Sequence, residues 1–100
     1  MKDITISIKK VAGAFAENKD LARDIRNTKL KPALAKGTEV VIDFAGVDGV
    51  TQSFIHALIS ELIREFGPEA LDRLSFKDCN TRIQNIIMIV VDYMQESDDH

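Results

Sequence analysis

The segment from Val40 to Phe54 constrains the fold of this chain more than any other. It opens with Val40-Val41-Ile42, a run in which every residue is apolar. Strands that are apolar on both faces are typically central in a sheet and covered by helices on either side. Glycines and aspartates then form a turn, and Thr51 is placed to cap a following helix, because its oxygen can accept a free N–H of the first turn. The segment therefore predicts a central strand, a short turn and a helix.

The residues before this segment predict a strand and a helix. Isoleucine alternates with polar residues over positions 4–8, which is typical of a strand buried on one face. Residues 11–16 are ambiguous and could form a second short strand. Asn18 or Asp20 can cap the next helix, and Pro32 should end or kink it, because proline lacks the backbone N–H and clashes with the preceding turn.

In that first helix we expect Leu21, Ala22 and Ile25 to be buried, whereas Arg23 and Arg26 face water. Basic residues continue as far as Lys36, but acidic residues are mixed among them. Such a mixture usually indicates a solvated face, although an acidic protein partner could use it.

Further helices and a third strand follow Thr51. The helix that Thr51 caps carries an apolar stripe as far as Phe66 and should stop at Gly67-Pro68. Residues 74–79 read as a short strand, and Asn80 or Thr81 can cap the last helix. This alternation predicts an α/β fold with a mostly parallel sheet of three or four strands and flanking helices. We expect a single domain over residues 1–100, with its core at about 4–94 and a polar tail at 95–100.

The composition excludes several classes of protein. A net charge of −3 argues against a nucleic-acid-binding role, which requires a basic surface. The longest apolar run, at 86–91, is too short to span a bilayer, and no signal peptide is visible at the start of the sequence. One cysteine excludes an internal disulfide and fits a reducing compartment. We therefore expect a cytoplasmic protein with neither a nucleic-acid nor a membrane partner.

Three side chains are candidates for a chemical role: Asp43, Cys79 and His56. Asp43 ends the central strand, and the simplest interpretation is that it accepts hydrogen bonds from the N–H groups of the Gly46–Gly49 turn. Cys79 precedes a helix, where a thiol can become a nucleophile, so a cysteine-based enzyme is an alternative function, although a buried inert thiol is the simpler reading. His56 has no clustered partner ligands, so we expect no metal site.

The last helix is apolar around much of its circumference. Besides its core stripe it carries Met88, Ile89, Val91 and Tyr93. Either both sides are buried within the domain, or one side is an association surface that forms a homodimer or assembly.

One block of the chain carries a family resemblance. It reads Ile42-Asp43-Phe44-x-Gly46-Val47-x-x-Val50-Thr51-x-Ser53-Phe54-x-x-x-Leu58. This pattern resembles the STAS-like domain family of bacteria, which is related to the STAS domains of anti-sigma factor antagonists. The likeness extends more loosely from Ile4 to Met94. It implies the STAS architecture, with no cofactor and no catalytic machinery.

The resemblance also implies a function and a site. Antagonists carry a serine in the turn after the central strand. The partner that phosphorylates this serine is an anti-sigma factor with a histidine-kinase-like ATPase domain, which acts as a serine kinase. Ser53 matches that serine by position. On local chemistry alone, Thr51 is a helix cap and Ser53 an ordinary helical residue. The expected function is a non-enzymatic protein-binding module in signalling. Its partner contacts would be Asp48, Gly49, Thr51, Gln52, Ser53 and His56, with Asp43 and Gly46 shaping the turn.

Overall fold

The computed structural model describes residues 3–97, and its main sheet is parallel and three-stranded. The strands are β1 (Asp3–Ser7), β3 (Glu39–Asp43) and β5 (Leu74–Lys77), and β3 lies between the other two. Val40 and Ile42 are buried on the covered face. The predicted α/β class, parallel pairing and central strand are therefore confirmed.

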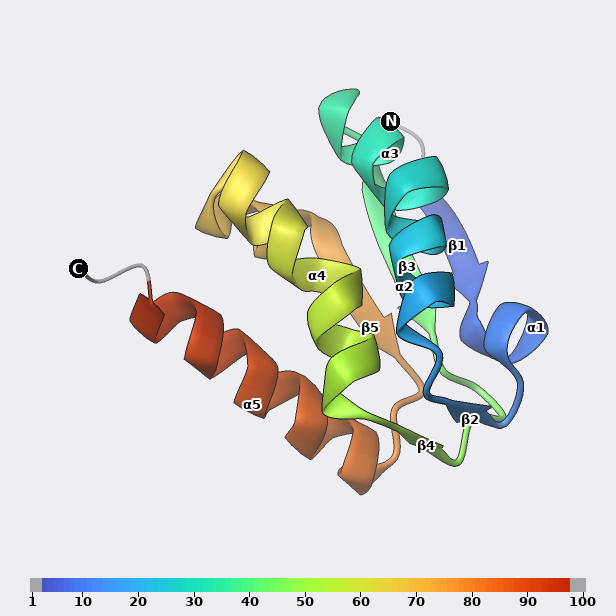
Figure 1. Ribbon diagram of the computed structural model, residues 1–100. Coiled ribbons are helices and arrows are strands. Elements are labelled where there is room, and N and C mark those ends of the chain that lie inside the picture. The colour runs from blue at the N-terminus through green and yellow to red at the C-terminus, as the bar shows by residue number, and fades with distance from the viewer. Residues whose placement is uncertain (1–2, 98–100) are drawn as a thin grey trace.

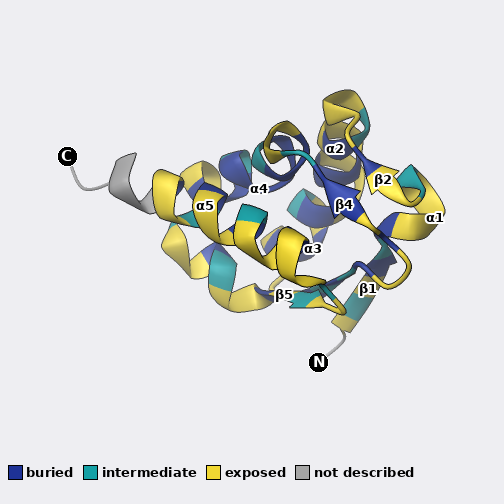
Figure 2. Ribbon diagram, turned by 90° about the horizontal axis from the view of Figure 1, so that it is seen from below, coloured by how far each residue is buried: buried dark blue, intermediate teal, exposed yellow. Residues whose placement is uncertain are grey.

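Helices cover one face of this sheet, not both. The helices α2 (Lys19–Ile25) and α4 (Gln52–Phe66) lie side by side over the sheet, and α5 (Thr81–Ser97) packs on the other side of α4 (Figure 1). On the opposite face Thr5 and Ser75 are exposed and Val41 between them is only half-buried (Figure 2). The expectation of cover on both faces was wrong, because the neighbouring strands carry polar residues in register with Val41.

A second, two-stranded parallel sheet supports the start of α4. It pairs β2 (Phe15–Ala16) with β4 (Gly49–Val50). The ambiguous residues 11–16 thus supply a strand of two residues. The sequence did not predict the preceding helix α1 (Ile8–Ala12), whose first residue had been expected to continue β1. Ser7 caps α1, since its side chain accepts from the Lys10 N–H at 3.4 Å.

The helical segment that contains Pro32 does not end at that residue. After α2 the backbone forms a π-helix over Arg26–Leu30 and then α3 over Lys31–Ala35. The Lys31 N–H bonds the Arg26 carbonyl, five residues back, so the wider turn accommodates the hydrogen bond that proline cannot make. The segment ends at Gly37, where φ is 79°.

The remaining elements agree with the sequence except at the C-terminus. Asn18 is the cap of α2, and Gly67 ends α4 before a 3-10 helix over Pro68–Arg73. The last helix runs to Ser97, so residues 95–97 of the expected polar tail are helical; residues 98–100 lie outside the described part. Among residues 3–97, no helix has both the length and the apolar character needed to cross a bilayer.

Candidate functional site

Ser53 is exposed in the first turn of α4. Thr51 precedes the helix with extended backbone, and its Oγ1 accepts a hydrogen bond from the Phe54 N–H at 3.1 Å. This bond confirms Thr51 as the cap. Phe54, next to Ser53, is fully buried, which anchors the turn and directs the serine outward.

The turn between β3 and β4 is shaped as the sequence suggested, with one correction. Asp43 Oδ1 accepts from the N–H of Ala45 at 2.9 Å, not from an N–H within Gly46–Gly49. An aspartate side chain commonly accepts from the backbone N–H two residues ahead of it, as in an Asx turn. Asp43 therefore bonds the N–H of Ala45 and not a donor further along the turn. Gly46 follows with a φ of 81°, a conformation that favours glycine. Asp43 and Gly46 therefore build the turn.

Hydrogen bonds fix the end of this turn to two other parts of the chain. The Asp48 N–H donates to the Ala14 carbonyl at 2.7 Å, and the Thr51 N–H donates to the Ala16 carbonyl at 3.0 Å. From the other side Asn80 Nδ2 donates to the Asp48 carbonyl at 2.8 Å. The start of α4 is thus held from both sides and presents Ser53 on a rigid support.

Gly49 lies beneath an aromatic ring. A Cβ added at Gly49 would come within 3.0 Å of the Phe15 ring, and Phe15 itself is 53% exposed. Gly49, which was predicted to contact the partner, is therefore buried. The ring of Phe15 covers it and forms the surface at this position. Sequence reasoning missed Phe15, because only the pairing of β2 with β4 brings it there.

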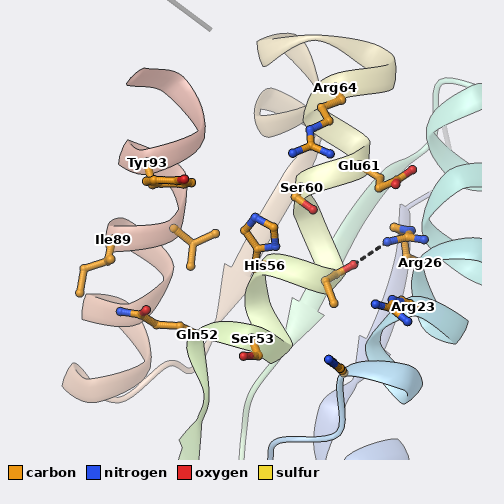
Figure 3. Close-up of a pocket in the computed structure, with 13 residues that line it drawn as sticks. Arg23, Arg26, Gln52, Ser53, His56, Ser60, Glu61, Arg64, Ile89 and Tyr93 are labelled. Carbon is orange, nitrogen blue, oxygen red and sulfur yellow. Dashed lines mark hydrogen bonds between the residues drawn. The ribbon is translucent and has the colours of Figure 1, made fainter. Parts of the chain in front are cut away.

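A groove of about 560 Å³ lies along the exposed side of α4, between α2 and α5 (Figure 3). Three of the predicted contact residues, Gln52, Ser53 and His56, line it. The neighbouring helices contribute basic side chains from one side and apolar side chains from the other. These are Lys19, Arg23, Arg26, Ile89, Val90 and Tyr93.

Arg26 was expected to face water, and that expectation was wrong. Its residue is only 9% exposed, and its Nη1 donates to the Ala57 carbonyl of α4 at 2.9 Å, while its Nε donates to Asn27 Oδ1 at 3.3 Å. Arg26 stands four residues after the buried Ala22, which puts both on the same helical face and is the signal that could have revealed it. Within the described part of the chain, no carboxylate pairs with this guanidinium.

The groove is basic although the whole chain is acidic. Lys19, Arg23, Arg26 and Arg64 line it, whereas Glu61 is the one carboxylate of its lining among residues 3–97. Glu61 also faces Lys31 of α3, whose Nζ lies 3.9 Å from its Oε2. Anionic groups are therefore favoured in the groove.

The exposure of α5 decides between the two interpretations of that helix, which were burial of both sides within the domain and an association surface on one side. Met88 and Tyr93 are each 61% exposed and Ile89 is 51% exposed, so both sides of the helix are not buried within the domain. Ile89 and Tyr93 form the apolar wall of the groove, and Met88 lies outside it. Of the two interpretations, the one that remains is an association surface on the exposed side of α5.

Cys79 does not line the groove, and its thiol is not activated. Burial raises the pKa of its thiol, and the charges of Asp78 and Asp43 raise it further. A thiol in such surroundings stays protonated at neutral pH, which disfavours a nucleophilic role. In residues 3–97 no group of three or more His, Cys, Asp and Glu side chains could hold a metal ion.

Comparison with known proteins gives one family. A model described as the STAS-like domain of unknown function (DUF4325) matches residues 22–84. This range contains β3, the turn, α4 and β5, and it confirms the resemblance drawn from residues 42–58. No curated protein and no solved structure matches the chain. The roles of the individual site residues stay predictions.

Proposed function

Because the chain belongs to the family of STAS-like domains, we propose that it is a non-enzymatic regulatory module that binds a protein partner in the cytoplasm. The partner expected from the STAS relationship is a histidine-kinase-like ATPase that acts as a serine kinase or an anti-sigma factor. The observation that supports this function best is the exposed Ser53, which stands on a rigid helix start at one end of a groove.

The proposed docking surface consists of the Asp48–Ser53 turn and the exposed side of α4. The exposed Gln52 and the half-buried His56 offer polar contacts, and Tyr93 of α5 offers an aromatic one. Aromatic and arginine side chains are the usual anchors of protein interfaces, and both types meet here. Preorganised surfaces of this kind lose little conformational entropy on binding.

Phosphorylation of Ser53 is the proposed switch. A phosphate adds about −1.5 to −2 charges at neutral pH. The helix start tolerates this charge, because free N–H groups and the helix dipole favour an anion there. The switch would therefore change the docking surface without unfolding the domain, and docking of the partner would be lost.

Two measurements test this function. Mass spectrometry of the protein from its native host, grown with and without stress, should find phosphate on Ser53 or Thr51. A tagged chain should capture an ATPase of the histidine-kinase-like type, and Ser53→Glu should reduce that capture at least tenfold while Ser53→Ala keeps it. Ser75→Glu, which puts the same charge on the open face of the sheet, is the matched control. An unmodified Ser53 under every condition would contradict the switch.

The exposed side of α5 favours a second function, assembly into a homodimer. Ile89 and Tyr93 lie four residues apart on one side of the helix and are exposed, as is Met88, and exposed apolar surface can mark an association site. Light scattering over a concentration series should show a dimer that Met88→Asp and Ile89→Asp disperse. A strict monomer at every concentration would exclude this function.

A further inference from the structure

Arg26 is a buried cation without a counter-ion in the described residues. Its guanidinium bonds a neutral carbonyl and a neutral amide, and it reaches the groove that Ser53 lines. Burying a charge is costly unless an opposite charge compensates it. The groove therefore offers a fixed positive charge to an incoming anion.

Contacts between the helices place Arg23 level with Ser53 in the groove that both residues line. Arg26 contacts Ala57, and Lys31, five residues later, lies near Glu61 and Glu65 of α4. The two helical segments thus run parallel and in step. Arg23 lies three residues before Arg26, so it is level with the turn before Ala57, where Ser53 stands. Figure 3 shows Arg23 and Ser53 at one end of the groove and Arg64 at the other.

Arg23 is free to exchange its present partner. Its Nη1 lies 3.3 Å from Asp20 Oδ1, in a pair whose side chains are 54% and 80% exposed. Exposed pairs of this kind contribute little to stability, because water screens them. A phosphate carries more charge than a carboxylate and offers arginine two parallel hydrogen bonds, so it should displace Asp20.

We propose that the phosphate of phosphorylated Ser53 is bound in cis by Arg23, with the charge of Arg26 behind it. This inference rests on the proposed function, since it concerns the same serine. In the reaction a bond forms between Ser53 Oγ and the γ-phosphorus of ATP, the bond to ADP breaks, and the hydroxyl proton is released. The captured phosphate then neutralises the basic end of the groove, so an acidic partner segment loses the charges that would hold it.

The test uses the full chain with phosphoserine encoded at position 53, so no kinase is required. A ³¹P NMR titration measures the second pKa of the phosphate, which is about 6 in an unstructured peptide. We expect it about one unit lower in the folded protein than in a phosphopeptide of residues 49–57. Arg23→Gln should return at least half of this shift, and Arg23→Lys should keep most of it.

Arg64→Gln is the matched control. It removes the same charge from the same groove, but its position on α4 is eleven residues from Ser53, about 16 Å along the helix. This variant should leave the shift nearly unchanged. Lys19, Asp20 and Asp48 are the other charged side chains near this end, and they are constant in all variants. Because histidines titrate in the same pH range, the comparison is repeated with His56→Gln.

Equal shifts in Arg23→Gln and Arg64→Gln, or a pKa equal to that of the peptide, would overturn capture in cis. Neither result would contradict the proposed function, which depends on phosphorylation of Ser53 in the host. Conversely, an unmodified Ser53 in the host would remove the switch and leave the measured capture intact. Arg23 is exposed, so its variants should fold, and their circular dichroism should match that of the parent chain.

Discussion

The chain builds the same strand-to-helix junction twice, and the two junctions differ in what surrounds them. At the start of α4, Thr51 accepts from the N–H of Phe54; at the start of α5, Asn80 Oδ1 accepts from the N–H of Ile83 at 2.9 Å. In both cases the third helical residue is fully buried. Their local geometry is therefore equivalent.

The surroundings give the two junctions opposite electrostatic character. The α4 junction faces Lys19, Arg23 and Arg26 across a groove, which favours an anion at Ser53. The α5 junction follows Cys79, where burial raises the pKa of the thiol and the charges of Asp78 and Asp43 raise it further, which disfavours an anion. A helix start is therefore not a site by itself; the charges that neighbouring elements bring to it decide its chemistry.

The largest effect should come from the buried residue at each junction. Phe54→Ala should lower the free energy of unfolding by about 3–5 kcal/mol and Ile83→Ala by about 2–5 kcal/mol, because both side chains are completely buried and leave cavities. Urea denaturation measures this. Ser53→Ala is the control and should change it by less than about 0.5 kcal/mol. Similar values for Phe54→Ala and Ser53→Ala would mean that the first turn of α4 is not packed as described.

The two caps should differ by a smaller amount. Thr51→Ala removes one hydrogen bond and should cost about 1 kcal/mol. Asn80→Ala removes both the cap of α5 and the bond to the Asp48 carbonyl, so it should cost about 2 kcal/mol. Denaturation of both variants under one set of conditions compares them directly. Equal losses would show that the bond from Asn80 to Asp48 contributes nothing.

Arg26→Met should have little effect on folding and a large one on anion binding. Replacing a buried, uncompensated cation by an apolar side chain of similar length should leave the free energy of unfolding unchanged or raise it by about 1 kcal/mol. Denaturation measures the stability. A loss of more than about 2 kcal/mol would show that the bond to Ala57 is structural and that Arg26 is not kept for a ligand.

The smallest effect concerns Cys79. Because the pKa of its thiol is raised, the reactive thiolate is scarce at pH 7–8, and alkylation should be slower than in a peptide and accelerate as pH rises. Asp78→Asn removes one of the causes and should speed alkylation at pH 8. Mass spectrometry of timed iodoacetamide reactions measures the rate. Alkylation faster than in the peptide would revive the cysteine-enzyme alternative.

Local spacing predicted a large part of the fold and part of the site. The apolar run at Val40 predicted the central strand, and a hydroxyl or amide before an apolar stripe predicted Thr51 as one cap and Asn80 as one of two candidates for the other. These features depend on neighbours in the chain, so the sequence displays them directly. The family resemblance at residues 42–58 was confirmed on the same segment.

Other features depend on partners that are distant in the chain and were missed. Arg26 is buried because α2 packs against the Ala57 carbonyl, thirty-one residues away. Phe15 covers Gly49 because β2 pairs with β4. The helix through Pro32 continues because a π-helix absorbs the missing donor, an adjustment that helical periodicity does not describe.

By itself, the sequence determined the three strands of the main sheet, the helices α2, α4 and α5, the cap at Thr51, and that Ser53 stands in a first turn. Each of these follows from side-chain volume and hydrogen bonding within a few residues. Only the tertiary structure decided that the sheet has one open face and that Ser53 shares a groove with Arg23 and Arg26. Electrostatic interactions and burial depend on residues that are distant in the chain. The basic character of the groove around Ser53 therefore depends on how α2, α4 and α5 pack together.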